Sequence, residues 1–243
     1  MFGIFKKNDI STRGPDSREL QVPYEDVLPS EVLTFLSRRS DLNSPELMIN
    51  VLDVDTSAEM TSAMRSIGVG RHLGLVVLVD ANDSNPYCYI TGGVAAGMVV
   101  HFNHDPEPRI EFKSLHSFEA FLLGLRSRGQ ELGEVEVASP SHPSQVALAV
   151  VLSELARATE DVNAESLICL YLPLLRGEHA KVLEILATHE SFFVREAVAE
   201  AIRSALLPES GAVLRALAAD SHPQVRSAAV RASEILQHVR RDA

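Results

Sequence analysis

The sequence predicts two joined parts: an α+β unit with a mostly antiparallel sheet and flanking helices, and an α-helical solenoid. Two observations carry this prediction. Short apolar runs follow one another between residues 74 and 112, with amphipathic runs on either side, which is typical of a sheet with packed helices. Residues 144–243 instead repeat themselves at a fixed offset, and such self-similarity indicates stacked supersecondary units.

The repeat is visible as matching residues. Segment 182–187 aligns with 213–218, and segment 194–198 aligns with 225–229 at the same offset of 31 residues. A third, degenerate copy at 144–177 lacks the Val-Arg pair of the other two, as expected of a terminal unit. We therefore expect about three helix pairs, which is the lower limit for a self-supporting stack. For that reason the first helix, over 146–158, is expected to pack on the α+β unit.

The run from Asp220 to Ala229 (DSHPQVRSAA) closely resembles a HEAT repeat, of the short type also found in bilin lyases. The resemblance implies that the arginine of the Val-Arg pair contacts an aspartate in the turn between the two helices. Arg226 has this partner in Asp220. His189 takes the place of the aspartate in the preceding copy, so Arg195 lacks it.

Four regions follow from composition and periodicity. Residues 1–23 mix charge, Ser, Gly and Pro without an apolar period, which indicates a flexible arm. The α+β unit spans 24–126, a polar, Pro-containing segment at 127–143 links the two parts, and the repeat unit spans 144–243.

The elements of the α+β unit follow from apolar periodicity and turn residues. The run at 74–80 (GLVVLVD), which is continuously apolar up to its last residue, is expected at the centre of the sheet, and a short extra strand at 134–137 could add to it. The other expected elements are helices over 29–39, 58–67 and 115–126, and strands over 47–54, 87–91, 97–102 and 109–112.

Several short motifs of this unit occur in the order and spacing of a known family. They are Leu28-Pro29, Ile67-Gly68, the strand at 74–80, Gly97-x-Val99 running into His104-Asp105, and Ser117-Phe118-x-x-Phe121-Leu122. Residues 24–123 thereby resemble the SUKH superfamily, which includes a yeast cell-wall synthesis regulator and many bacterial immunity proteins. For a bacterial chain, the resemblance implies an immunity protein that binds a toxin domain in the cytoplasm and blocks it sterically.

The charge balance bears on the kind of partner. The chain has 22 basic and 33 acidic residues, a net charge of −11 that is spread over both halves. A field of this sign repels nucleic acid and anionic membrane and steers a basic protein toward the surface. No apolar run reaches the roughly 18 residues of a membrane span, and no signal-peptide core is present, so we expect a cytoplasmic location.

No residue pattern indicates catalysis, and we expect no cofactor and no metal. His101-x-x-His104-Asp105 is the most metal-like group, but residues three apart on a strand point to opposite faces, which favours a strand end and turn. The run at 80–84 lacks the later ligands of a calcium loop, and the glycines at 92–97 lack the lysine and helix of a phosphate loop.

Binding is the function that the repeats predict, because stacked helix pairs present an extended surface. The expected partner-binding residues are Glu190, Glu196, Glu200, His104 and Asp105. The glutamates have an alternative interpretation as a solvated helix face. The predicted function is non-catalytic binding of a protein, in the first place a basic toxin domain. The alternatives are a scaffold or assembly factor without a toxin partner, and a lyase-like enzyme suggested by the short repeat type.

Overall fold

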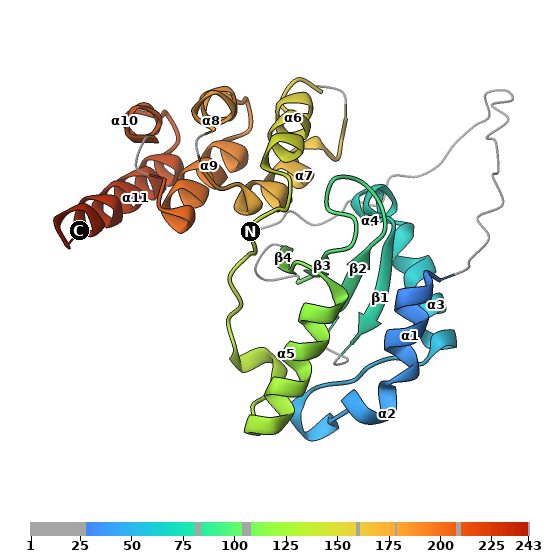
Figure 1. Cartoon of the computed structure of the whole chain (residues 1–243). Helices are drawn as coiled ribbons and strands as arrows, with labels where there is room; N and C mark the ends of the chain where they lie inside the picture. Colours follow the sequence, from blue (N-terminus) through green and yellow to red (C-terminus); the bar gives the residue numbers. More distant parts are fainter. Residues whose placement is uncertain are drawn as a thin grey trace, which may run out of the picture.

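The computed structural model of the chain describes residues 28–80, 84–103, 108–158, 161–177, 179–207 and 210–242. Its architecture is mixed α+β, with a four-stranded antiparallel sheet and helices around and beyond it (Figure 1). The expected arm at 1–23 and two of the expected partner-binding residues, His104 and Asp105, lie outside the described residues.

The sheet is a meander in which each strand pairs with the next, in the order β1-β2-β3-β4. The strands are β1 (Leu75–Val79), β2 (Tyr87–Ile90), β3 (Val99–His101) and β4 (Arg109–Phe112). Each lies within its expected range, and β4 matches it at both ends. The four runs form strands because they are rich in branched and aromatic residues, which suit a pleated, buried surface.

The expected central position of β1 is wrong, because β1 stands at one edge of the sheet. All of its residues are nonetheless buried, since α3 (Val54–Arg65) packs against it. The Ser57 hydroxyl donates to the carbonyl oxygen of Val77 at 2.5 Å, and the Thr61 hydroxyl accepts from the Val77 N–H at 3.0 Å. These bonds satisfy backbone groups that an edge strand would leave open. The apolar run of β1 therefore indicates that the strand is buried, and α3 is the element that buries it.

The expected strand over 47–54 is also wrong. A 3-10 turn, Pro45–Leu47, precedes Met48 in the left-handed conformation, and Ile49 and Val51 take part only in isolated bridges. The side chain of Asp53 then accepts from the N–H of Thr56 at 2.8 Å, which starts α3 four residues earlier than expected. Ile49 and Val51 are fully buried without forming a ladder, so their apolar pattern was correct for burial alone.

Helices cover both faces of the sheet. Along β2 the side chains enter two different hydrophobic clusters in alternation, as the two-residue period of a strand requires, while β1 and the β3–β4 pair carry irregularities that interrupt this alternation. On one face Phe118 stacks on Tyr87 with the ring centroids 5.0 Å apart, next to buried residues of the first helices. The remaining helices of this half are α1 (Ser30–Ser37), α2 (Arg39–Leu42), α4 (Gly68–Leu73) and α5 (Leu115–Arg128).

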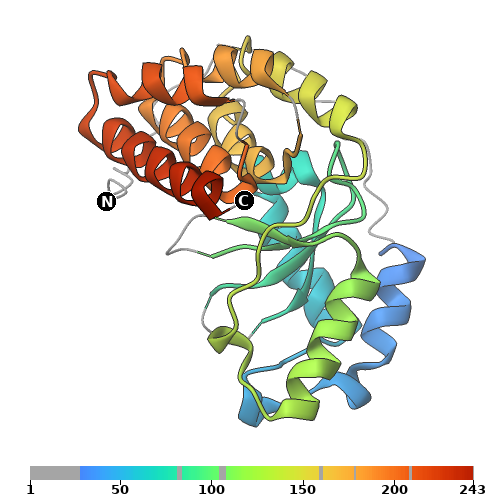
Figure 2. The ribbon, with the colours of Figure 1, turned by 60° about the vertical axis from the view of Figure 1, so that its left-hand side comes forward.

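The second half is helical. Its helices are α6 (Gln145–Leu155), α7 (Ala164–Tyr171), α8 (Ala180–Leu186), α9 (Phe192–Ala205), α10 (Gly211–Ala218) and α11 (Pro223–Asp242). Consecutive helices pair, and the pairs lie next to one another, so that α6, α8 and α10 form a first row and α7, α9 and α11 a second row (Figures 1 and 2). Val194 and Val225, one repeat offset apart, are both fully buried, and so are Leu186 and, nearly, Leu217.

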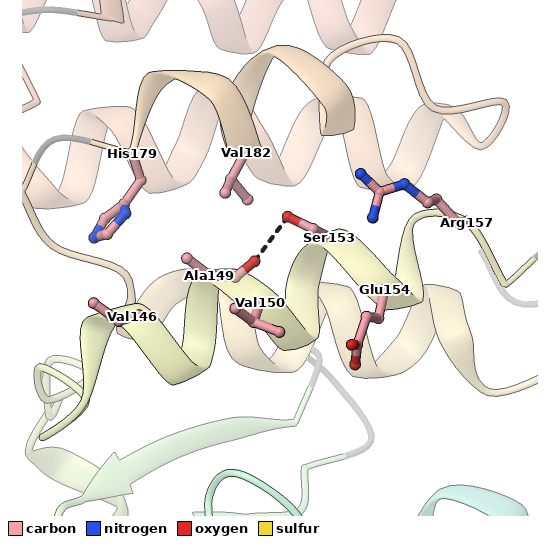
Figure 3. A pocket seen from close by; sticks show the side chains of 8 residues that line it. All are labelled: Val146, Ala149, Val150, Ser153, Glu154, Arg157, His179 and Val182. Atoms are coloured by element: carbon pink, nitrogen blue, oxygen red, sulfur yellow. Dashed lines mark hydrogen bonds between the residues drawn. The ribbon is translucent and has the colours of Figure 1, made fainter.

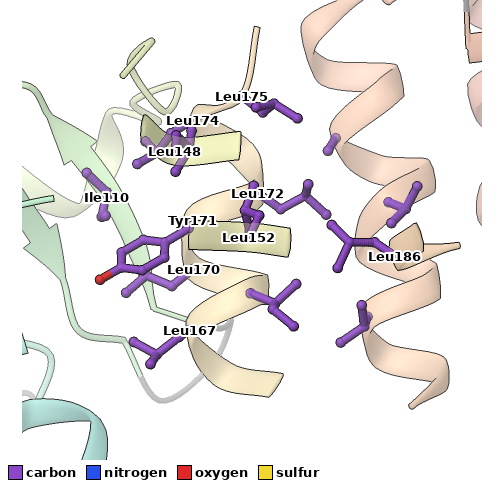
Figure 4. Close-up of a cluster of buried hydrophobic side chains, with 14 of the residues drawn as sticks. Ile110, Leu148, Leu152, Leu167, Leu170, Tyr171, Leu172, Leu174, Leu175 and Leu186 are labelled. Atoms are coloured by element: carbon purple, nitrogen blue, oxygen red, sulfur yellow. The ribbon is translucent and has the colours of Figure 1, made fainter. Parts of the chain in front are cut away.

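One hydrophobic cluster joins the sheet to the helical rows. It runs from Leu75 of β1 through α6 and α7 to Leu236 of α11. Figure 4 shows Ile110 of β4 beside Tyr171 of α7 within this cluster. The helix expected to pack on the sheet was α6. The structure instead places α7 against β4. The buried leucines of α6 belong to the same cluster. The sheet and the helices thus share one core.

The segment that joins the two halves is held at several points. His142 is buried, its Nε2 lies 2.7 Å from the carbonyl oxygen of Val94, and its backbone N–H donates to Leu174. Arg176 donates from Nη2 to the carbonyl oxygen of Ser139 at 2.8 Å. The expected short strand at 134–137 does not form; a 3-10 turn, Leu132–Glu134, stands at its start. These bonds fix Ser139 and His142 against a loop of the sheet and against the turn that follows α7.

Candidate functional site

A groove of about 660 Å³ lies where the sheet meets the second row of helices. The start of β4 and residues 136–139 form one wall, the end of α7 with the turn after it forms the floor, and α9 forms the other wall. The groove is therefore built by segments far apart in the sequence, which the shared core brings together.

The face of α9 that lines the groove is set by helical periodicity. Val194 and Val198 are fully buried in the shared core. Phe193, Glu196 and Glu200 follow one another at spacings of three and four residues, and all three line the groove. Two of the expected partner-binding glutamates are thus brought to the same hollow.

Two adjacent phenylalanines at the start of α9 have different environments. Phe192 stacks on His222 of the next inter-helix turn, with ring centroids 3.7 Å apart and planes at 19°. Phe193 contacts Phe192 at 4.0 Å and stays 38% exposed in the groove. Phe193 is not among the partner-binding residues predicted from the sequence. The two adjacent phenylalanines could have indicated an exposed ring. Neighbouring positions of a helix point in different directions, so a helix that buries one face does not bury both rings.

Glu200 is neutralised within the chain. Its carboxylate accepts from Arg203 Nε at 2.7 Å and from Arg231 Nη2 at 2.9 Å. Burial alone would raise the pKa of Glu200, but the hydrogen bonds from Arg231 and Arg203 outweigh it and hold the pKa below its usual value. Glu200 therefore ties α9 to α11 and offers little free negative charge.

The other charges near the groove are also mostly engaged. Arg109 pairs with Glu136 at 3.6 Å across the first wall. Arg176 in the floor donates to three backbone carbonyl oxygens, those of Pro173, Leu175 and Ser139, at 2.6–2.8 Å. Burial lowers the pKa of Arg176. The arginine is held by dipoles and makes no ion pair within the described chain.

Glu196 differs from these residues. Its side chain is half-buried in the groove wall, one turn after Phe193. Within the described residues its carboxylate makes neither an ion pair nor a hydrogen bond. The groove therefore presents one carboxylate without a partner beside an exposed aromatic ring.

The remaining predicted site residues lie elsewhere. Glu190 is exposed in the turn between α8 and α9, and its carbonyl oxygen accepts from Arg195 Nη1 at 2.8 Å; its side chain does not line the groove. His104 and Asp105 are outside the described residues. Nearby, His101 stacks on Tyr87 at 4.1 Å and its Nδ1 lies 3.4 Å from a carboxylate oxygen of Glu111, at the edge of a smaller hollow of about 310 Å³.

The repeat arginines are structural, but their pairing differs from the expected one. Arg195 donates to the carboxylate of Asp220 through Nε at 2.7 Å and Nη2 at 3.1 Å. The carboxylate of Asp220 thus pairs with the arginine of the preceding copy and not with Arg226 of its own copy. Arg226 donates instead to the backbone carbonyl oxygens of Asp220 and Ser221, at 2.7 and 2.8 Å. The single aspartate therefore links two consecutive copies.

A further hollow, of about 350 Å³, lies on the first row between α6 and α8 (Figure 3). It is lined mainly by valine and alanine, with Arg157 and His179 at its ends. Val146 and Val150 of α6 border it and are 73% and 50% exposed. This hollow faces away from the groove, because it belongs to the other row.

Comparison of the chain with protein-family models, with curated proteins and with solved structures finds no match in any of the three. Within the described part of the chain, no helix has the length and hydrophobicity needed to cross a bilayer. In the same part, no three His, Cys, Asp or Glu side chains come together in a way that could hold a metal ion.

Proposed function

We propose that this chain is a non-catalytic protein-binding module that acts as a bacterial immunity protein in the cytoplasm. It binds a cognate toxin domain and neutralises it sterically. The observation that carries the proposal is the groove between the sheet and the second row of helices. It holds an exposed aromatic ring, Phe193, and the carboxylate of Glu196, which has no partner in the described part of the chain. Exposed aromatics with a charged neighbour in a concave site are the groups that anchor protein interfaces.

The proposal includes the finer nature of both halves. The sheet with helices on its faces is taken as a SUKH-like unit, and the two helical rows as a short HEAT-like solenoid. The match in burial between Val194 and Val225 supports a repeated unit, and so does the link from Arg195 to Asp220 across two copies. A solenoid of this kind offers its second row as a binding surface.

A basic partner is favoured by the net charge of −11, which steers cationic proteins toward the chain. The sequences of α7, α9 and α11 carry six arginines and five acidic residues, so the negative field arises from other elements. Long-range attraction and local contact are therefore separate contributions. The first sets the association rate and is screened by salt, while the second sets how long the complex lasts.

The test is protection of growth. The chain is co-expressed with the C-terminal domain of the toxin encoded beside its gene, and complex formation is followed by size-exclusion chromatography with light scattering. Wild type restores growth and forms a stoichiometric complex. F193A with E196K loses both, whereas E184K, a matched charge reversal on α8 outside the groove, retains them. If the wild-type chain does not restore growth of the toxin-expressing cells, the proposed immunity function is wrong.

A further inference from the structure

Most charged side chains of the groove are paired within the chain, and one differs from the rest. Glu200 is held by two arginines, Glu136 by Arg109, and Arg176 by three carbonyl oxygens. Only Glu196 among these groove charges has no partner in the described chain. Glu196 therefore carries a charge that no cation of the described chain neutralises, and a cation brought by a partner can pair with it in the half-buried wall of the groove.

Arg176 is prevented from supplying that cation. Its Nη1 donates to the carbonyl oxygens of Pro173 and Leu175 at 2.6 and 2.8 Å, and its Nη2 donates to Ser139 at 2.8 Å. Its own backbone N–H donates to the side chain of Gln145 at 2.6 Å. Moving the guanidinium to Glu196 would break these bonds, which hold the joining segment against α7. The floor of the groove is therefore fixed while the carboxylate in the wall stays open.

The surroundings of Glu196 favour one kind of cation. Phe193 lies one turn earlier on the same side of α9 and exposes its ring to the groove. Ala197 and Ala201, also on this wall, are small and leave room above the helix. A planar guanidinium can pair with a carboxylate through two N–H groups and lie over an aromatic face, whereas an ammonium offers a more strongly hydrated point charge.

We propose that the groove receives an arginine side chain of the partner, held by the Glu196 carboxylate and the Phe193 ring. This inference rests on the proposed binding function and names the chemistry that the groove recognises. Phe193 gives the contact its apolar part, and Glu196 gives it direction and charge.

The test uses the full chain alone with short peptides as probes. The ¹⁵N-labelled protein is titrated with Ac-Gly-Arg-Gly-NH2, and in parallel with peptides that have lysine or citrulline in place of arginine. The arginine peptide shifts the amide signals of α9 and of residues 136–139 in a saturable way. Lysine binds more weakly, and citrulline, which keeps the shape without the charge, does not bind.

Variants assign the contact to its residues. E196Q, which is nearly isosteric, weakens binding of the arginine peptide about tenfold or more, as expected for loss of a charge-assisted hydrogen bond. F193L weakens it by a smaller factor, and E184Q, at an exposed position of α8 outside the groove, leaves it unchanged. The spectra themselves report whether each variant is folded. Equal shifts with citrulline, unchanged affinity in E196Q, or shifts outside the groove overturn the proposal.

The two experiments fail independently. Arginine binding without growth protection keeps the groove chemistry and removes the toxin partner. Growth protection without arginine binding keeps the immunity function and removes the arginine contact.

Discussion

The carboxylate of Asp220 is the most consequential single group in the helical half. It accepts from Arg195 Nε at 2.7 Å and Nη2 at 3.1 Å, and from the backbone N–H of His222 at 2.7 Å. The side chains of Arg195 and Asp220 are 13% and 11% exposed. One side chain thus joins α9 to the turn between α10 and α11, and the substitution D220A removes all three bonds at once.

The expected loss of stability follows from these contacts. Two hydrogen bonds between charged groups in a mostly buried site contribute about 2 kcal/mol together, and the bond that caps the turn adds about 1 kcal/mol. In D220A, Arg195 keeps its two bonds from Nη1 to the carbonyl oxygens of His189 and Glu190. The loss of stability is therefore smaller than it would be for a buried guanidinium left without any partner. The free energy of unfolding should fall by about 3 kcal/mol and Tm by about 6–12 °C.

Urea denaturation followed by circular dichroism measures the change, with R226A as the control. Arg226 is exposed and donates only to backbone carbonyl oxygens, so its loss should cost under about 1 kcal/mol. D220N keeps an acceptor for His222 and should fall between D220A and wild type. If D220A is no more destabilising than R226A, the link between the copies does not hold the stack together.

The same pair gives a pH dependence with a defined sign. The hydrogen bond from Arg195 holds the pKa of Asp220 below its usual value. A carboxylate whose pKa is lower in the folded state stabilises the fold above its unfolded pKa, about 3.9, and loses this contribution as pH falls through the folded pKa. The stability difference between wild type and D220N should therefore be constant above about pH 5 and shrink below about pH 4. A constant difference down to pH 2 would contradict this assignment.

Three further outcomes are expected. Native protein should react with a thiol reagent at Cys169, which lines the groove, and not at buried Cys88, whose thiol pKa burial raises; C169A should abolish the reaction, and a bound partner should slow it. Y171F should leave stability unchanged or raise it by up to about 1 kcal/mol, because the Tyr171 hydroxyl is buried without a hydrogen-bond partner in the described chain; a loss above 1 kcal/mol would reveal a missed partner. Deletion of 144–243 should abolish cooperative unfolding of the first half, since Ile110 and its neighbours lose their cover; a sharp near-native transition would show that the sheet does not need the helices.

Local patterns in the sequence predicted several elements closely. The four sheet strands lie within their expected ranges, because runs of branched and aromatic residues between turn signals leave few other conformations. Val194 and Val225, which the repeat offset of 31 residues aligns, are both fully buried. Where the prediction failed, at 47–54, Ile49, Val51 and Leu52 are buried, but Met48 and Val54 are exposed. Two isolated bridges and the start of α3 replace the expected ladder.

The candidate site was predicted only in part. Glu196 was identified from its place on the second helix of a repeat, but Glu200 carries the same local signal and is neutralised by Arg231, which lies 31 positions away. Phe193 was not singled out at all. Whether a glutamate is open or paired depends on which cations the fold brings to it, and that information is not local.

The sequence by itself determined where the chain alternates between exposed and buried, since hydrophobic periodicity is a property of neighbouring residues. It thereby specified the strands, the helical second half and its repeat. Only the tertiary structure decided that β1 stands at an edge covered by α3, that Asp220 reaches back to Arg195, and that α9 faces β4 across a groove. These features depend on the distances between groups remote in sequence, and those distances are fixed only when the shared core closes.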